Sequence, residues 1–168
     1  MGRSFGTVVF SHGKESGPWG AKITAMAAVV CELDLAVESV DDRGMDDPAL
    51  RVRKLIEVGS ALEQPLVLVG SSMGGHVSAA AAGRLKPRGM FLLAPAFYMA
   101  GYEQYTPQDV ACPTAIVHGW SDDIVPVQNA IRWAGEHRAT LHVLDSGHRL
   151  EDQIEAIGVL LRWFLTRL

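Results

Sequence analysis

The stretch Leu66-Val67-Leu68-Val69-Gly70-Ser71-Ser72-Met73-Gly74 decides how this chain folds. Its first four residues are all apolar, which is typical of a strand buried on both faces. Gly70 ends this run, and the segment 73–85 contains four consecutive alanines that favour a helix lying close to its neighbours. A buried strand that turns abruptly into a helix of small residues predicts one strand–helix unit of a parallel sheet covered by helices.

Short apolar runs and longer helical stretches alternate along the rest of the chain as well. This alternation predicts an α/β fold, specifically a three-layer α/β/α sandwich around a mainly parallel sheet of about six strands. We expect strands at 7–10, 35–40, 66–69, 90–93, 114–117 and 140–144, and helices at 19–33, 46–62, 73–85, 127–137 and 151–168. Polar residues and glycines follow several of these strands, at the sheet edge where ligands bind in open parallel sheets.

Length and composition indicate one globular domain spanning 1–168. The chain has 168 residues and a mass of 18.1 kDa; 48% of its residues are hydrophobic and 20% are charged. This mixture excludes global disorder, and the chain is too short for two separate cores. The formal net charge of −4 disfavours a nucleic-acid partner, because nucleic acids bind basic surfaces.

The sequence also indicates a cellular location. No apolar stretch approaches the ~20 residues of a membrane span, and the N-terminus lacks the ~7–15 apolar residues of a secretory signal, so no membrane insertion is expected. Cys31 and Cys112 do not have the spacing of a zinc site or a disulfide framework. We therefore expect reduced cysteines in the core of a cytoplasmic protein.

A candidate nucleophile lies in the turn of the opening stretch. The pattern G-x-S-x-G fits with Ser72 at its centre, whereas a frame centred on Ser71 puts Val69 and Met73 where glycines belong. The pattern follows an expected strand and opens an expected helix, as the turn called a nucleophile elbow requires. We expect the Ser72 hydroxyl to project at the tip of the sheet. The alternative is a glycine-rich turn with two helix-capping serines.

A serine hydroxyl is a weak nucleophile at neutral pH and needs a base, for which histidine is suited. Five of the six histidines fall within or directly beside expected strands and helices: His12, His76, His118, His137 and His142. Structural hydrogen bonding is expected of His12 and His118, which each precede a glycine at a strand end. His148 lies in the loop after the last expected strand, next to Gly147, and is the candidate base.

The base needs a carboxylate that orients it. Asp122 and Asp123 follow the strand at 114–117 and would lie one loop away from His148. Asp145 ends the strand that leads toward His148 and is a third candidate. The residues alone leave the choice among these three carboxylates open.

Negative charge that develops on a substrate oxygen needs hydrogen-bond donors. We expect one donor to be the backbone amide of Met73, directly after Ser72, and the other to be the amide of Lys14, in the loop after the first strand. Phe97, Tyr98 and Trp120 follow two of the expected strands and are expected to bound the substrate pocket. The alternative for these aromatic residues is packing within their own loops.

Taken in order along the chain, these motifs resemble the α/β-hydrolase superfamily, in particular its small, lid-less bacterial serine esterases. The matching stretches are V-V-F-S-H-G, L-V-G-S-S-M-G-G, V-H-G-W-S-D-D-I-V-P and D-S-G-H. In that family the aspartate of H-G-x-x-D-x-x-V-P orients the base, and the histidine of the last motif is the base. The resemblance therefore implies a catalytic triad of Ser72, Asp122 and His148.

The resemblance also implies a minimal version of that fold with an open site. The first two strands of the full-size fold are missing, and the segment after the strand at 90–93 is too short for a cap domain. Lys14 stands where many relatives carry an apolar residue, which makes a preference for anionic substrates conceivable.

The activity implied is that of a serine hydrolase that cleaves carboxylic esters of small or medium acyl groups through an acyl-enzyme. Its partner would be a small-molecule ester or thioester. The sequence contains no H-E-x-x-H, Walker loop or G-x-G-x-x-G, so no metal or organic cofactor is expected. The alternatives are a thioesterase, deacylase or acyltransferase with the same triad, and a non-catalytic binding protein on a hydrolase scaffold.

Overall fold

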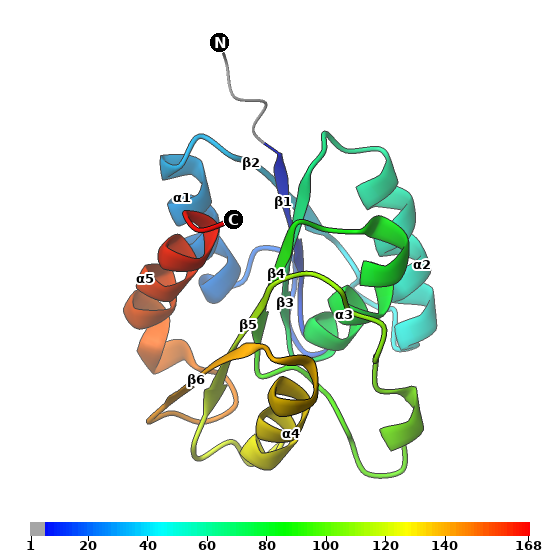
Figure 1. The fold of residues 1–168 in the computed structure, drawn as a ribbon, viewed down its shortest axis with the longest axis vertical. Coiled ribbons are helices and arrows are strands. Elements are labelled where there is room, and N and C mark those ends of the chain that lie inside the picture. The colour runs from blue at the N-terminus through cyan, green and yellow to red at the C-terminus, as the bar shows by residue number, and fades with distance from the viewer. Residues whose placement is uncertain (1–5) are drawn as a thin grey trace.

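The computed structural model describes residues 6–168, which form a six-stranded parallel sheet covered by five α-helices (Figure 1). The strands are β1 (Thr7–Ser11), β2 (Ala36–Val40), β3 (Leu66–Ser71), β4 (Gly89–Leu93), β5 (Thr114–Gly119) and β6 (Thr140–Leu144). The helices are α1 (Ala21–Glu32), α2 (Pro48–Ser60), α3 (Met73–Leu85), α4 (Val127–His137) and α5 (Ile154–Leu165). The strand order is β2-β1-β3-β4-β5-β6, and the predicted α/β/α sandwich is confirmed.

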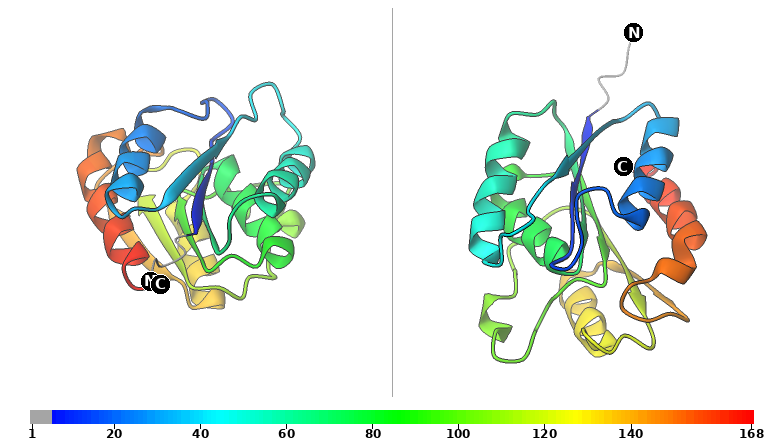
Figure 2. Two further views of the ribbon diagram at one scale, coloured as in Figure 1. Left: turned by 90° about the horizontal axis from the view of Figure 1, so that it is seen from above. Right: turned by 180° about the vertical axis from the view of Figure 1, so that it is seen from behind.

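Two layers of helices cover the two faces of the sheet (Figure 2). α1 and α5 pack together on one face, and α2, α3 and α4 cover the other. Along β3 the side chains of Val67 and Val69 enter the first core, whereas those of Leu66 and Leu68 enter the second. Both faces of β3 are therefore buried, which explains why its first four residues are all apolar.

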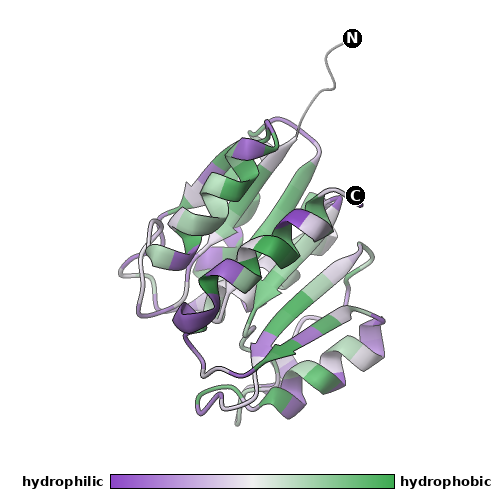
Figure 3. Cartoon of the chain, turned by 90° about the vertical axis from the view of Figure 1, so that its left-hand side faces the viewer, coloured by the Kyte–Doolittle hydropathy of each residue, from purple (hydrophilic) through white to green (hydrophobic). Residues whose placement is uncertain are grey.

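The helices, unlike the central strands, bury only one of their sides. Figure 3 shows hydrophobic colour along the strands and an alternation of hydrophobic and hydrophilic segments along the helices. In α5, for example, Ile157 and Leu161 are buried whereas Val159 is exposed, as expected for a helix lying on a sheet. Among residues 6–168, none of the helices combines the length and the apolar character needed to cross a bilayer.

Two details differ from the expectations. The sequence predicts a closing helix from residue 151, but Glu151–Gln153 form a 3-10 turn and α5 begins at Ile154. Leu150, which has a φ of 55°, redirects the chain just before this turn. The prediction that both cysteines lie in the core is wrong: Cys31 is exposed on the solvent side of α1, and Cys112 is only half-buried.

His142, in the edge strand β6, should make stability depend on pH. Its Nε2 is buried and has no hydrogen-bond partner among residues 6–168, its ring lies edge-on to Trp163, and burial lowers the pKa of the imidazole. Below about pH 6.5 the unfolded chain therefore binds a proton that the folded chain resists, so the free energy of unfolding falls as the pH falls. His142→Phe should flatten the decline between about pH 7 and pH 5, as measured by urea unfolding. An unchanged slope would contradict this origin.

Candidate active site

Three loops that follow parallel strands meet at one edge of the sheet. The turn after β3 carries Ser72, the loop after β5 carries Asp122, and the loop after β6 carries His148. Parallel strands all end at the same edge, so residues 76 positions apart in sequence are brought into contact here.

Ser72 occupies a strained turn between β3 and α3. Its φ is 54° and its ψ is −116°, a conformation that non-glycine residues rarely adopt and that often marks functional sites. The turn is so tight that a Cβ at Gly70 would lie 2.2 Å from the carbonyl oxygen of Gly74. The Ser72 side chain makes no capping hydrogen bond to α3, so the alternative of a helix-capping serine does not apply to this residue.

The three predicted side chains form a continuous hydrogen-bonded chain. His148 Nε2 lies 3.0 Å from Ser72 Oγ, and His148 Nδ1 lies 2.7 Å from Asp122 Oδ2. A carboxylate only accepts hydrogen bonds, so the proton of a neutral His148 is on Nδ1 and Nε2 accepts from the serine hydroxyl. The Asp122 side chain is fully buried and that of His148 is 17% exposed, so the imidazole forms the open end of the chain.

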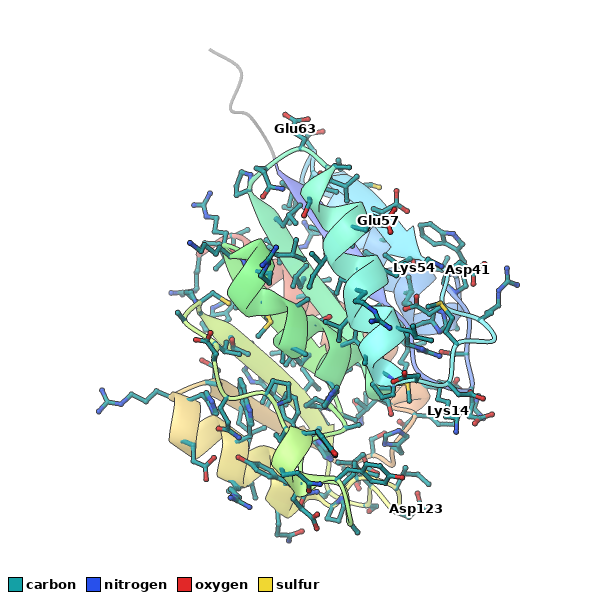
Figure 4. All side chains as sticks on the ribbon, turned by 90° about the vertical axis from the view of Figure 1, so that its right-hand side faces the viewer. Lys14, Asp41, Lys54, Glu57, Glu63 and Asp123 are labelled. Atoms are coloured by element: carbon teal, nitrogen blue, oxygen red, sulfur yellow. The ribbon has the colours of Figure 1, made fainter. Side chains whose placement is uncertain are left out.

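Asp122 is the carboxylate that the structure brings to the histidine. Its Oδ1 accepts from the backbone amides of Ile124 and Val125, at 2.9 and 2.8 Å. Asp123 is exposed and lies at the edge of the molecule in Figure 4, and Asp145 is exposed as well. Of the three candidate carboxylates, the structure thus brings to His148 the one that the family resemblance indicated.

His118 contacts the same carboxylate, although the sequence indicated only a structural role at a strand end. Its Nε2 lies 3.1 Å from Asp122 Oδ2 and 2.8 Å from the carbonyl oxygen of Val125. Both partners accept, so Nε2 carries the proton; burial lowers the pKa of the imidazole and keeps it neutral near pH 7. The one signal in the sequence was the spacing of four residues between His118 and Asp122.

The loop after β1 lies against the Ser72 turn. A Cβ at Gly13 would be 3.6 Å from the Cβ of Ser72. The backbone amides of Lys14 and Met73 donate no hydrogen bond to any of residues 6–168. The Lys14 side chain itself is exposed (Figure 4). Both predicted donor amides are therefore unpaired within residues 6–168, which a donor to a bound oxygen requires.

The three aromatic residues expected to bound the substrate pocket differ in their exposure to solvent. Trp120 is 59% exposed in the loop that carries Asp122, but Phe97 is fully buried and stacks on Trp133 with a centroid separation of 4.7 Å. Tyr98 is also buried, and its hydroxyl donates to Glu136. Phe97 and Tyr98 thus belong to the core, because their loop folds back onto α4, and of the three aromatic residues only Trp120 presents its side chain to solvent.

Lys22 in α1 is a charged group near the site that the sequence did not reveal. Its Nζ donates to the hydroxyl of Ser71, the neighbour of Ser72, at 3.3 Å. Burial lowers the pKa of this ammonium, and the charges of Glu151 and Asp122 partly offset the effect. Nothing in its local sequence distinguishes it from an ordinary helix lysine, since only folding places α1 beside β3.

A family model described as an uncharacterised protein family (UPF0227) matches residues 7–108. The chain belongs to this family. A protein from Xanthomonas campestris pv. campestris assigned to the alpha/beta superfamily of hydrolases is 31% identical, with a TM-score of 0.90 over 97% of this chain and 99% of that one. None of the curated proteins compared with the sequence matches it.

Two further structures resemble this member of the family. A lid-less serine hydrolase from Xanthomonas campestris is 25% identical, with a TM-score of 0.77 over 96% of this chain and 81% of that one. Est1E from Butyrivibrio proteoclasticus, with ferulic acid bound, is 14% identical, with a TM-score of 0.81 over 96% and 88%, and shares the fold. The chain is a hydrolase of the α/β superfamily.

Gly119 should be required for the approach of the Asp122 and His148 loops. A Cβ there would lie 2.3 Å from the carbonyl oxygen of Ser146 and 2.6 Å from that of Gly147. Gly119→Ala should push the loops apart, lower the free energy of unfolding by about 1–3 kcal/mol, and weaken the downfield NMR signal of the hydrogen-bonded His148 imidazole proton.

Gly135→Ala is the matched control, because a Cβ at Gly135 in α4 meets no atom within 4 Å. This helical substitution should leave stability unchanged or raise it by up to about 1 kcal/mol. A Gly119→Ala protein with unchanged stability and an unchanged imidazole signal would contradict the role assigned to Gly119.

Proposed function

We propose that this protein is a serine hydrolase that cleaves carboxylic esters of small or medium acyl groups through an acyl-enzyme. The observation that carries the proposal is the unbroken chain of hydrogen bonds from buried Asp122 through His148 to the Ser72 hydroxyl. Similarity to a lid-less serine hydrolase supports it.

In the first half of the reaction, Ser72 Oγ attacks the carbonyl carbon of the ester while His148 Nε2 takes the hydroxyl proton. The tetrahedral intermediate then expels the alcohol, which takes that proton from His148, and the acyl group stays on Ser72. In the second half, water attacks the acyl carbon and gives a proton to His148. Collapse releases the carboxylic acid, and the proton returns to Ser72.

Asp122 stabilises the imidazolium that forms in both halves. Its carboxylate accepts from the amides of Ile124 and Val125 and from His148, and the His118 Nε2 lies 3.1 Å from its Oδ2, so its negative charge is well stabilised in the buried site. Such an anion keeps His148 in the tautomer that leaves Nε2 facing Ser72. The amides of Met73 and Lys14 would bind the oxyanion, each contributing about 3–4 kcal/mol to transition-state stabilisation.

The proposed site is not covered by a cap domain, so the substrate would bind in an open site at the edge of the sheet. The segment between β4 and β5 contains a single 3-10 turn, Glu103–Tyr105, and folds against α4. Trp120 is exposed beside the Asp122 loop and offers an apolar surface to an acyl or alcohol group. An aryl ester with a short acyl chain is therefore a suitable first substrate.

Ser72→Ala removes the proposed nucleophile and should abolish two signals of the wild-type protein. These are hydrolysis of a short p-nitrophenyl ester and labelling by a fluorophosphonate, which needs an activated hydroxyl. Ser71→Ala is the matched control, because Ser71 adjoins Ser72 but contacts Lys22 rather than His148, and it should keep the label. A fluorophosphonate signal that persists in Ser72→Ala would exclude Ser72 as the nucleophile.

Asp122→Asn should lower kcat by about 10²–10⁴-fold, because an amide at this position favours the wrong tautomer of His148. Asp123→Asn offers a matched comparison: the same change, one residue away, on an exposed side chain, should leave kcat within about twofold. Steady-state kinetics on an ester and on the thioester of the same acid would check this and also establish the preferred leaving group. A larger loss in the Asp123 variant would contradict the assignment.

A further inference from the structure

A buried arginine reaches the loop that carries Lys14. Arg51, in α2, is 1% exposed. Its Nη1 donates to the carbonyl oxygens of His12 at 3.0 Å and of Gly13 at 3.4 Å, and its Nε donates to that of Met45 at 2.7 Å. The planar guanidinium thus ties the loop after β1 to the segment that precedes α2, with donors in a fixed relative geometry.

The side chain of His12 also binds the carbonyl oxygen of Gly13. Its Nδ1 donates to Gly13 O at 2.7 Å, and its Nε2 accepts from the backbone amide of Asp42 at 2.9 Å, which defines the tautomer. The hydroxyl of Ser16 approaches Gly13 O at 3.5 Å. The Gly13 carbonyl is therefore surrounded by donors from three side chains, and its direction is strongly determined.

The direction of this carbonyl determines the direction of the neighbouring amide. Gly13 C=O and Lys14 N–H belong to one planar trans peptide group, so they point in opposite directions. The donors that hold Gly13 O inside the loop therefore turn the Lys14 N–H away from Arg51 and His12. The same loop packs against the Ser72 turn, where a Cβ at Gly13 would lie 3.6 Å from Ser72 Cβ.

We infer that Arg51 and His12 are positioning residues that aim the Lys14 amide at the oxyanion formed beside Ser72. The inference rests on the proposed function. It adds that a residue of α2, Arg51, holds the Lys14 amide in position as an oxyanion donor. On this inference, stabilisation of the oxyanion depends on the guanidinium of Arg51, although that group does not itself contact the substrate.

The surroundings of Arg51 explain how the fold accommodates a buried cation. The carboxylate of Asp42 is 1% exposed and accepts no hydrogen bond from residues 6–168, so it compensates the guanidinium through its charge alone. Lys54 Nζ, 3.9 Å from Asp42 Oδ1, is the other cation beside this carboxylate, and it contacts the backbone of Asp41 but not the loop after β1. Lys54 is thus a matched control for Arg51.

The test compares Arg51→Lys with Lys54→Met in the full-length protein. Arg51→Lys keeps the buried positive charge but loses the planar guanidinium, whose separate nitrogens bind the carbonyl of Met45 and the two loop carbonyls at once. Four quantities are measured: kcat and KM for a p-nitrophenyl ester, the inhibition constant of an aryl trifluoromethyl ketone, and the melting temperature. The ketone forms a tetrahedral adduct with Ser72 whose oxyanion needs the Lys14 amide.

We expect Arg51→Lys to lower kcat by about 10–100-fold and to weaken inhibition by the ketone by a similar factor, with KM changed by less than about threefold. Lys54→Met should leave all three kinetic constants within about twofold. If Arg51→Lys does not fold, the double variant Asp42→Asn/Arg51→Met, which removes both buried charges together, replaces it with the same expectation.

A folded Arg51 variant with unchanged kcat and unchanged inhibition would overturn the inference while leaving the proposed hydrolase activity in place. So would equal losses in the Lys54→Met control, or a loss confined to KM. A wild-type protein that neither hydrolyses the ester nor binds the ketone would instead overturn the proposed function itself.

Discussion

The site depends first on the close contact of backbone segments around the turn from β3 into α3. Ser72 has a positive φ, and this strained conformation is maintained because the surrounding backbone segments are packed tightly against the turn. Where Gly70 faces Gly74, no room exists even for a methyl group, and Gly74 in turn lies against the carbonyl of Ser11 in β1. The packing of the turn against two strands therefore stabilises the strain that exposes the serine hydroxyl.

Buried charges at the catalytic edge are compensated in two different ways. Asp122 accepts hydrogen bonds from two backbone amides at one oxygen and from His148 at the other, so each of its oxygens has a donor. Arg51 is balanced at a distance by Asp42, and its own hydrogen bonds go to backbone carbonyls. In both cases the cost of burying a charge is offset by groups that also fix the path of a loop, which couples the electrostatics of the site to its geometry.

Much of the site could be predicted from local sequence because its key features are local. The elbow needs a strand, two glycines and a helix within a short stretch, and 66–85 contains all of them. The aromatic residues show the limit of this reasoning. Phe97, Tyr98 and Trp120 all lie in loops after strands, yet only Trp120 is exposed, because the loop that carries Phe97 and Tyr98 packs on Trp133 and Glu136 of α4.

By itself, the sequence determined the order of strands and helices, the double-sided burial of the sheet and the identity of the residues at the ends of β3, β5 and β6. These features follow from hydrophobic periodicity and turn chemistry, which act over a few residues. Only the tertiary structure decided that His118 contacts the aspartate that meets His148, and that Arg51 reaches a loop 38 residues earlier in the chain. Those contacts depend on the three-dimensional paths of loops and on the relative placement of whole elements, about which local patterns of residues carry little information.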